Sequence, residues 1–209
     1  MIECARGQAP PWLDVSRETL VSFDALLTLV EKWNPAINLV AKGSLPEAWQ
    51  RHILDSAQLL AFAPPSATHW ADFGSGAGFP GLVVAIMARD TRPHLAVTLV
   101  ESDKRKASFL MQAARDLSLK VRVLTDRAET LAGLSADVIS ARALAPLPDL
   151  CALGFRHLMP DGLAIFPKGA QAQQELANAA LHWRFDATST ISETDSAGRI
   201  LSLKNIRHA

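Results

Sequence analysis

The chain has 209 residues, of which 49% are hydrophobic and 20% charged, and it contains 11 glycines and 12 prolines. This composition excludes low-complexity and disordered chains, and it is typical of a globular protein with one large domain or one domain and an appendage. Its 21 Lys and Arg balance 21 Asp and Glu to a formal net charge of zero. Taken alone, that balance argues against a dedicated nucleic-acid-binding protein, which usually has a basic excess.

Neither a membrane anchor nor a metal site is expected. The longest apolar run, Phe79–Ala88, is much shorter than the ~20 residues of a membrane-spanning helix. Met1–Pro11 lacks the apolar stretch of a signal peptide. Cys4 and Cys151 have neither CxxC spacing nor a neighbouring histidine cluster. We therefore expect a cytoplasmic protein in a reducing compartment, without membrane partner or metal, and a monomer.

Residues 1–65 are predicted to form an N-terminal helical appendage. Apolar residues spaced by three and four follow Ser16 and predict one buried helical stripe: Leu20, Phe23, Leu27, Val30. This helix is expected to end near Asn34, because Pro35 disfavours helical geometry in the residue before it. A second helix is predicted from Pro46, with its own apolar stripe: Trp49, Ile53, Ala57, Leu60.

Residues 66–209 are predicted to form the main domain, in which short apolar strands alternate with helices. The expected strands are 69–73, 96–101, 121–124, 137–141, 163–166, 185–191 and 200–204. The expected helices are 80–89, 104–117, 147–158 and 171–180. Such alternation predicts an α/β fold, a mostly parallel sheet of these strands with helices on both faces. The last two strands are predicted to form an antiparallel hairpin at one edge.

A glycine-rich loop follows the first expected strand. Gly74, Gly76 and Gly78 allow a tight turn and close approach of a nucleotide-like ligand, although they could also serve the turn geometry alone. Their spacing is GxGxG, and Phe79 stands where a dinucleotide motif would have its third glycine. Asp72 would repel a pyrophosphate but suits the amino group of a methionine moiety. The loop therefore favours S-adenosylmethionine over NAD.

Acidic residues follow the next two strands of this sheet. Glu101 is placed at the adjacent strand end, where a carboxylate can accept hydrogen bonds from both ribose hydroxyls of an adenosine. Asp126, Ala128 and Glu129 follow the third strand, where a short turn can bind the adenine edge. Capping of a helix N-terminus is the alternative interpretation for Asp126 and Glu129.

The segment after the fourth strand, Ser140–Leu147, has no carboxylate, amide or cysteine. This favours an acceptor atom that is nucleophilic without deprotonation, such as guanine N7, and catalysis mainly by alignment of the reactants. Arg142 could bind the cofactor carboxylate or the acceptor edge of guanine, and a surface ion pair is the less favoured alternative. Lys168, after the fifth strand, is a candidate contact to phosphate or base, or else a solvated loop lysine.

Taken together, these segments resemble the bacterial 16S ribosomal RNA guanine-N7 methyltransferase family, RsmG, also called glucose-inhibited division protein B. The similar segments span nearly the whole chain: 32–40, 51–56, 71–81, 100–106, 140–143 and 166–169. The resemblance implies a Rossmann-like class I methyltransferase fold, S-adenosylmethionine as donor, and a guanosine in the decoding-region loop of 16S rRNA, in the small ribosomal subunit, as acceptor. By position it places cofactor contacts at Gly74, Phe79, Ala128, Glu129 and Arg142.

Arg51, His52 and Asp55 are spaced so that they can share one polar helix face. A hydrogen-bonded cluster between appendage and core is the favoured interpretation. An RNA contact by Arg51 or His52 is the alternative, and a metal site would need further ligands.

Two other functions stay open at this point: an NAD-type oxidoreductase, and a non-catalytic RNA-binding or cofactor-sensing module on the same fold. The distribution of charge bears on RNA binding. Residues 1–60 have 5 basic and 7 acidic side chains, whereas residues 104–127 have 7 basic and 2 acidic ones. A local basic segment within a neutral chain predicts modest, salt-sensitive RNA binding, because affinity depends on the phosphates contacted and not on the total charge.

Overall fold

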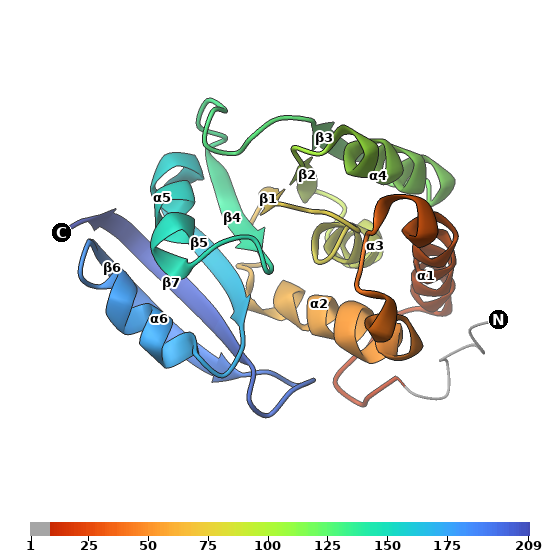
Figure 1. Cartoon of the computed structure of the whole chain (residues 1–209), viewed down its shortest axis with the longest axis horizontal. Coiled ribbons are helices and arrows are strands. Elements are labelled where there is room, and N and C mark those ends of the chain that lie inside the picture. The colour runs from red at the N-terminus through yellow and green to blue at the C-terminus, as the bar shows by residue number, and fades with distance from the viewer. Residues whose placement is uncertain (1–8) are drawn as a thin grey trace.

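The structure, a computed structural model, describes residues 9–209. Its centre is a seven-stranded sheet in the order β3-β2-β1-β4-β5-β7-β6. Helices α1, α3 and α4 cover one side and α5 and α6 the other (Figure 1). The predicted mostly parallel sheet with helices on both faces is confirmed.

The strands on both sides of the sheet centre run parallel. They are β1 (His69–Phe73), β2 (Ala96–Val100), β3 (Val121–Leu124), β4 (Ala136–Ala141) and β5 (Leu158–Lys168). The predicted edge hairpin is confirmed by β6 (Trp183–Ile191) and β7 (Arg199–His208), since β7 pairs antiparallel with both β5 and β6. The strand order reverses between β1 and β4, and in open α/β sheets ligands bind beyond the carboxyl ends of the strands at such a point.

Alternation along the strands creates two apolar cores. Trp70 belongs to the core on one face, under α3 (Gly81–Thr91) and α4 (Lys104–Asp116). Ala71 and Phe73 belong to the other core, which is covered by α5 and α6. These two helices are Leu147–His157 and Ala172–Ala179. Because successive strand residues point to opposite faces, β1 packs against both cores. The start of the loop that follows it is therefore fixed in position.

Helix α1 (Arg17–Ile37) begins as predicted but ends at Ile37, three residues after Asn34. Ser16 is its N-cap, and the Ser16 side chain accepts a hydrogen bond from the Thr19 N–H. The prediction of an end near Asn34 is wrong. Pro35 is exposed and has no N–H, but the final turn does not need a hydrogen bond from it. Asn34 closes that turn by accepting from the N–H groups of Asn38 and Val40.

The second predicted helix is not regular. It consists of consecutive turns of changing pitch: Lys42–Glu47 (η2), Trp49–Leu54 (η3), Asp55–Ala57 (α2) and Gln58–Phe62 (η4). We call residues 49–62 the α2 segment. The turn Trp49–Leu54 is wide, of the π type, and such turns often occur at functional sites. The wide turn contains Arg51 and His52 and is followed directly by Asp55.

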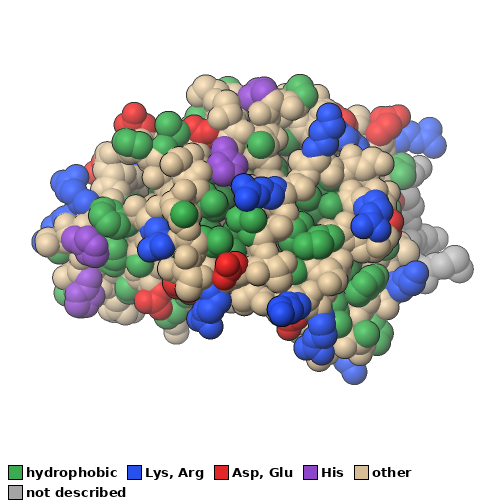
Figure 2. Space-filling view, turned by 90° about the horizontal axis from the view of Figure 1, so that it is seen from above, with side chains coloured by type: hydrophobic (Ala, Val, Ile, Leu, Met, Phe, Trp, Pro, Cys, Tyr) green, Lys and Arg blue, Asp and Glu red, His purple; other side chains and the backbone are tan. Residues whose placement is uncertain are grey.

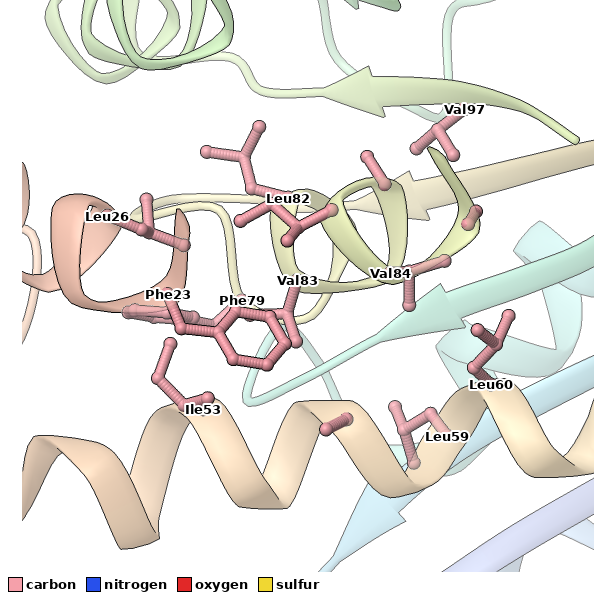
Figure 3. Close-up of a cluster of buried hydrophobic side chains, with 14 of the residues drawn as sticks. Phe23, Leu26, Ile53, Leu59, Leu60, Phe79, Leu82, Val83, Val84 and Val97 are labelled. Atoms are coloured by element: carbon pink, nitrogen blue, oxygen red, sulfur yellow. The ribbon is translucent and has the colours of Figure 1, made fainter. Parts of the chain in front are cut away.

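The appendage and the sheet share one apolar core. Figure 3 shows Phe23 and Leu26 of α1 and Ile53 of the α2 segment packed around Phe79 and the first turns of α3. All of these side chains are at most 4% exposed. The appendage is therefore fixed against the glycine loop, while the division into domains at residue 65 stays a prediction.

In residues 9–209, none of the helices combines the length and the apolar character needed to cross a membrane. Cys151 is a buried free cysteine, and burial raises the pKa of its thiol to about 12. The predictions for Cys4 and for the first eight residues lie outside the described part of the chain.

Candidate active site

The glycine-rich loop joins β1 to α3 at the switch point of the sheet. Its three glycines, Gly74, Gly76 and Gly78, have φ angles of 64°, 52° and 86°. A side chain is strained at such angles. At Gly74 a Cβ atom would also lie 2.6 Å from Cδ1 of Leu144. Gly74 is thus required for the turn, and a side chain there would displace the exposed Leu144 side chain.

Asp72 lies beneath this loop and is completely buried. Its carboxylate accepts hydrogen bonds from Ser140 Oγ at 2.6 Å and from the Gly81 N–H at 3.2 Å. Ser140 Oγ accepts in turn from Trp70 Nε1 at 2.8 Å. These bonds fix the loop to β1 and β4. A direct contact between Asp72 and a methionine amino group stays a prediction, because in the structure the carboxylate lines neither of the cavities described below.

Burial raises the pKa of Asp72 to about 6, although the hydrogen bonds from Ser140 and Gly81 oppose the shift. The folded chain therefore binds this proton more tightly than the unfolded chain, whose carboxyl has an ordinary pKa. Relative to an Asp72→Asn variant, the free energy of unfolding should fall as pH rises from about 4 to about 6, by up to about 3 kcal/mol, and then stay constant. Urea unfolding of both proteins at several pH values measures this difference. The same pH dependence in both would contradict the raised pKa.

Glu101 follows β2 directly and faces the same loop. Its Oε2 accepts from the Gly76 N–H at 2.9 Å, and its Oε1 accepts from the Asp103 N–H at 2.8 Å. Only 7% of the residue is exposed. Each carboxylate oxygen has further acceptor capacity, so the predicted ribose contact is compatible with these bonds and stays a prediction.

A small cavity of about 110 Å³ lies beyond the ends of β1, β2 and β3. It is lined by Gly74, Val100, Ser102, Asp126, Arg127, Ala128, Glu129 and Leu144. The structure thus brings Ala128 and Glu129 together with Gly74, as the predicted adenosine site requires. Asp126 Oδ1 accepts from the Arg127 N–H and from Thr130 Oγ1, so it caps a turn and not a helix.

His157, at the end of α5, contacts the backbone of Ala128, which lines this cavity. This residue was not predicted. It is completely buried, and its Nε2 lies 2.9 Å from the Ala128 carbonyl oxygen. The contact joins positions 29 residues apart. No motif in the sequence indicates it.

A larger cavity of about 770 Å³ opens beyond the ends of β4 and β5. Its walls include the α2 segment, the segment after β4 and the turn between β6 and β7; the charged lining residues are Arg51, Asp55, Arg142, Lys168, Glu175, Asp195 and Arg199. Leu144 lines both cavities. The two cavities are therefore neighbours that meet at the segment after β4.

Arg142, two residues before Leu144, lines the larger cavity and is bound by the appendage. Its Nη1 donates to the Arg51 carbonyl at 2.9 Å and to Asp55 Oδ2 at 3.2 Å, and its Nη2 lies 3.2 Å from His52 Nδ1. Its guanidinium carbon is 5.5 Å from the ring centre of Phe79. The favoured interpretation of Arg51, His52 and Asp55 as a hydrogen-bonded cluster between appendage and core describes this arrangement. Phe79 is 4% exposed and lines neither cavity with its side chain.

Lys168 lines the larger cavity but is not a solvated loop lysine. Its Nζ donates to Glu175 Oε2 at 2.7 Å and to the Ala145 carbonyl at 3.1 Å, and only 11% of its side chain is exposed. Glu175 also accepts from the Leu147 N–H at the start of α5. An ammonium group has three donors, so one remains for a ligand, and the contact to phosphate or base stays a prediction.

The basic segment 104–127 spans α4, β3 and the residues beside them. None of its cations lines the larger cavity, and Arg127 lines the small one. On the face shown in Figure 2, positive side chains are scattered among neutral ones and do not form one continuous patch. The cations that surround the larger cavity come instead from four separate places: Arg51, Arg142, Lys168, Arg199. Within residues 9–209, no group of three or more His, Cys, Asp or Glu side chains is arranged to bind a metal ion.

Comparison with known proteins assigns the chain to a family. The model of the GidB family, described as rRNA small subunit methyltransferase G, matches residues 19–200. The chain belongs to this family. The family prediction from the sequence is therefore confirmed.

Members of this family align with nearly the whole chain. A ribosomal RNA small subunit methyltransferase G of Cereibacter sphaeroides is 50% identical over 94% of this chain and 95% of its own length. A protein of the same name from Ruegeria sp. is 45% identical over 93% of this chain and 94% of its own.

Solved structures confirm the fold. A methyltransferase from Geobacter sulfurreducens superposes with a TM-score of 0.60 at 15% identity, and the match covers 95% of this chain and 94% of that one. At this identity the likeness concerns the fold alone, which is the Rossmann-like methyltransferase fold that the family resemblance implies.

Proposed function

We propose that this chain transfers a methyl group from S-adenosylmethionine to N7 of a guanosine in the decoding-region loop of 16S rRNA. The observation that supports this most is the meeting of two cavities at Leu144, beside Arg142. One cavity has the composition of an adenosine site and the other is large enough for a nucleobase. Membership of the rRNA small subunit methyltransferase G family supports the same reaction.

The residues at the small cavity fit the cofactor. Gly74 and Gly76 have no side chain that would block its approach, Glu101 offers acceptor atoms for ribose hydroxyls, and Ala128 and Glu129 line the part suited to adenine. When bound, S-adenosylmethionine supplies a methyl group on a positively charged sulfur. A 16S rRNA N2 G1207 methyltransferase of T. thermophilus, solved in complex with AdoMet and guanosine, shares this fold at a TM-score of 0.53 and 12% identity, over 74% of this chain and 39% of that one.

The larger cavity suits an acceptor that needs no general base. Two of its carboxylates are paired with cations, Asp55 with Arg142 at 3.2 Å and Glu175 with Lys168 at 2.7 Å. Asp195 lies in an exposed turn and accepts from the Ala197 N–H. Guanine N7 has a lone pair and no proton to lose, so this chain would act mainly by alignment and exclusion of water. Arg142 is placed to bind either the cofactor carboxylate or the acceptor edge of guanine.

Four cations and three carboxylates line the larger cavity. This small positive excess is compatible with an RNA substrate, because phosphate contacts supply most of the affinity for nucleic acids. Naked RNA and the assembled small subunit both fit this proposal. Action on ribosomal RNA supports a cytoplasmic location, and a monomeric state stays a prediction.

The main alternative among enzymes is an NAD-type oxidoreductase, which would place a pyrophosphate at the glycine loop. Asp72, buried directly beneath that loop, opposes a pyrophosphate. Isothermal titration with S-adenosylmethionine and with NAD distinguishes the two. We expect binding of the first only. Binding of NAD without binding of S-adenosylmethionine would overturn the proposal, and cofactor binding without methyl transfer to 16S RNA or 30S subunits would favour a sensing or binding module.

A further inference from the structure

The surroundings of Arg142 come from a part of the chain about 90 positions away. Its guanidinium contacts the Arg51 carbonyl, His52 Nδ1 and Asp55 Oδ2, all on the α2 segment. The side chains of Arg142 and Asp55 are 19% and 20% exposed. A partly buried, charge-assisted contact of this kind is stronger than an exposed ion pair.

The direction of each hydrogen bond fixes the state of His52. A guanidinium can only donate, so His52 Nδ1 must present its lone pair to Arg142. The ring proton is then on Nε2, which lies 3.0 Å from Ser44 Oγ. The Ser44 hydroxyl donates in turn to the Ala41 carbonyl at 2.8 Å. Every donor in this chain of contacts meets one acceptor, which requires a neutral His52.

Electrostatics agree with this neutral state. Burial is the main cause that lowers the pKa of His52 to about 4; the charges of Arg142 and Arg51 add to the shift, and a hydrogen bond with the Arg51 backbone opposes it. The His52 ring also stacks on Phe79, with centroids 5.0 Å apart and planes 14° apart. His52 therefore contacts both the ring beneath Arg142 and the guanidinium itself.

Asp55 connects Arg142 to the opposite wall of the larger cavity. While Oδ2 accepts from Arg142, Oδ1 accepts from Thr194 Oγ1 at 3.1 Å, in the turn between β6 and β7. Gln58 strengthens this connection, because its amide donates to Ser192 Oγ and its carbonyl accepts from the Glu193 N–H. One helical segment thus sets the position of Arg142 and of the wall that faces it.

We propose that His52 and Asp55 are positioning residues that fix the Arg142 guanidinium in the wall of the larger cavity and act on methyl transfer only through Arg142. This inference rests on the proposed function. A substitution at His52 that preserves its shape but not its acceptor should then have the same kind of effect as a change at Arg142 itself.

The test is a double-mutant cycle with His52→Phe and Arg142→Lys. Phenylalanine keeps the stacking on Phe79 but has no acceptor, whereas His52→Asn keeps an acceptor near the Nδ1 position. We expect His52→Phe to weaken whichever quantity Arg142→Lys weakens, the Kd for S-adenosylmethionine or the single-turnover transfer rate, by about tenfold. His52→Asn should recover most of this loss. In the Arg142→Lys background, His52→Phe should have less than about a twofold effect.

Two further measurements complete the test. Asp55→Asn removes the charge and replaces one of the two acceptor oxygens by an NH2 donor, so it should change the same quantity as His52→Phe. Glu47→Gln, in an exposed ion pair on the neighbouring turn, should change nothing. In the unliganded protein, ¹⁵N NMR should show His52 neutral with its proton on Nε2 at pH 7.

Independent, multiplicative losses in the double mutant would overturn the inference, and so would a His52 that is charged at pH 7 or protonated on Nδ1. The NMR result does not depend on activity. A wild-type protein with the expected His52 state that transfers no methyl group would contradict the proposed function and not the contact, whereas active wild type with uncoupled variants would contradict only this inference.

Discussion

Replacement of Arg142 by alanine is expected to lower methyl transfer by at least about 100-fold, because a preorganised cationic donor at the reacting groups typically contributes this much. The side chain lines the larger cavity and makes three polar contacts to the α2 segment. Transfer of labelled methyl groups to 16S RNA, at saturating cofactor, measures the loss.

The fold should persist in the Arg142→Ala variant, because Asp55 keeps Thr194 as a partner and His52 keeps Ser44. Thermal unfolding and circular dichroism provide the control. Turnover equal to that of the wild type would remove Arg142 from the active site. Arg142→Lys, which keeps the charge but loses the second nitrogen, should give an intermediate rate.

Replacement of Gly74 by alanine is expected to abolish measurable binding of S-adenosylmethionine and to cost about 1–2 kcal/mol in the free energy of unfolding. Two effects combine at this position: a φ angle of 64° and a Cβ that would lie 2.6 Å from Leu144 Cδ1. Leu144 lines both cavities, so its displacement would change both. Calorimetric titration and urea unfolding measure the two losses.

A second substitution separates the two effects at Gly74. Adding Leu144→Ala to Gly74→Ala removes the steric conflict but not the backbone strain, so it should recover part of the stability. Gly43→Ala is the matched control, because a Cβ there would have nothing within 4 Å and Gly43 lies outside both cavities. Cofactor affinity of Gly74→Ala equal to that of Gly43→Ala would contradict the role of this loop.

The sheet could be predicted from the sequence because the patterns that indicate its strands and helices lie within short stretches of the chain. Apolar strands alternate with amphipathic helices, and the GxGxG loop after the first strand marks the switch point where β1 separates from β4. The bounds of β5 were harder, since its first residues, before the buried Leu163–Phe166 stretch, are mostly exposed and lack an apolar pattern. The pitch of the α2 segment also has no local signal, because Trp49, Ile53, Ala57 and Leu60 fit a regular helix equally well.

Side-chain partners distant in sequence could not be predicted. Arg142 was expected at the site, but its partners on the α2 segment are 87 to 91 positions away. Lys168 was expected to be a contact to phosphate or base or else a solvated loop lysine, and its pairing with Glu175 depends on how α6 packs beside α5. Acidic residues at strand ends suggested ligand contacts, whereas Asp72 and Glu101 also bind N–H groups of the loop, which a strand pattern does not reveal.

The most direct test of the account identifies the methylated atom. After incubation of the protein with S-adenosylmethionine and 16S RNA or 30S subunits, reduction and aniline cleavage detect N7-methylguanosine, since methylation at N7 makes the ring labile. The account predicts a single new cleavage, at a guanosine in the decoding-region loop, which is lost in Arg142→Ala. Methyl transfer to an exocyclic amine, a ring carbon or a ribose oxygen would contradict it, because Asp55 and Glu175 are paired with cations and Asp195 lies in an exposed turn.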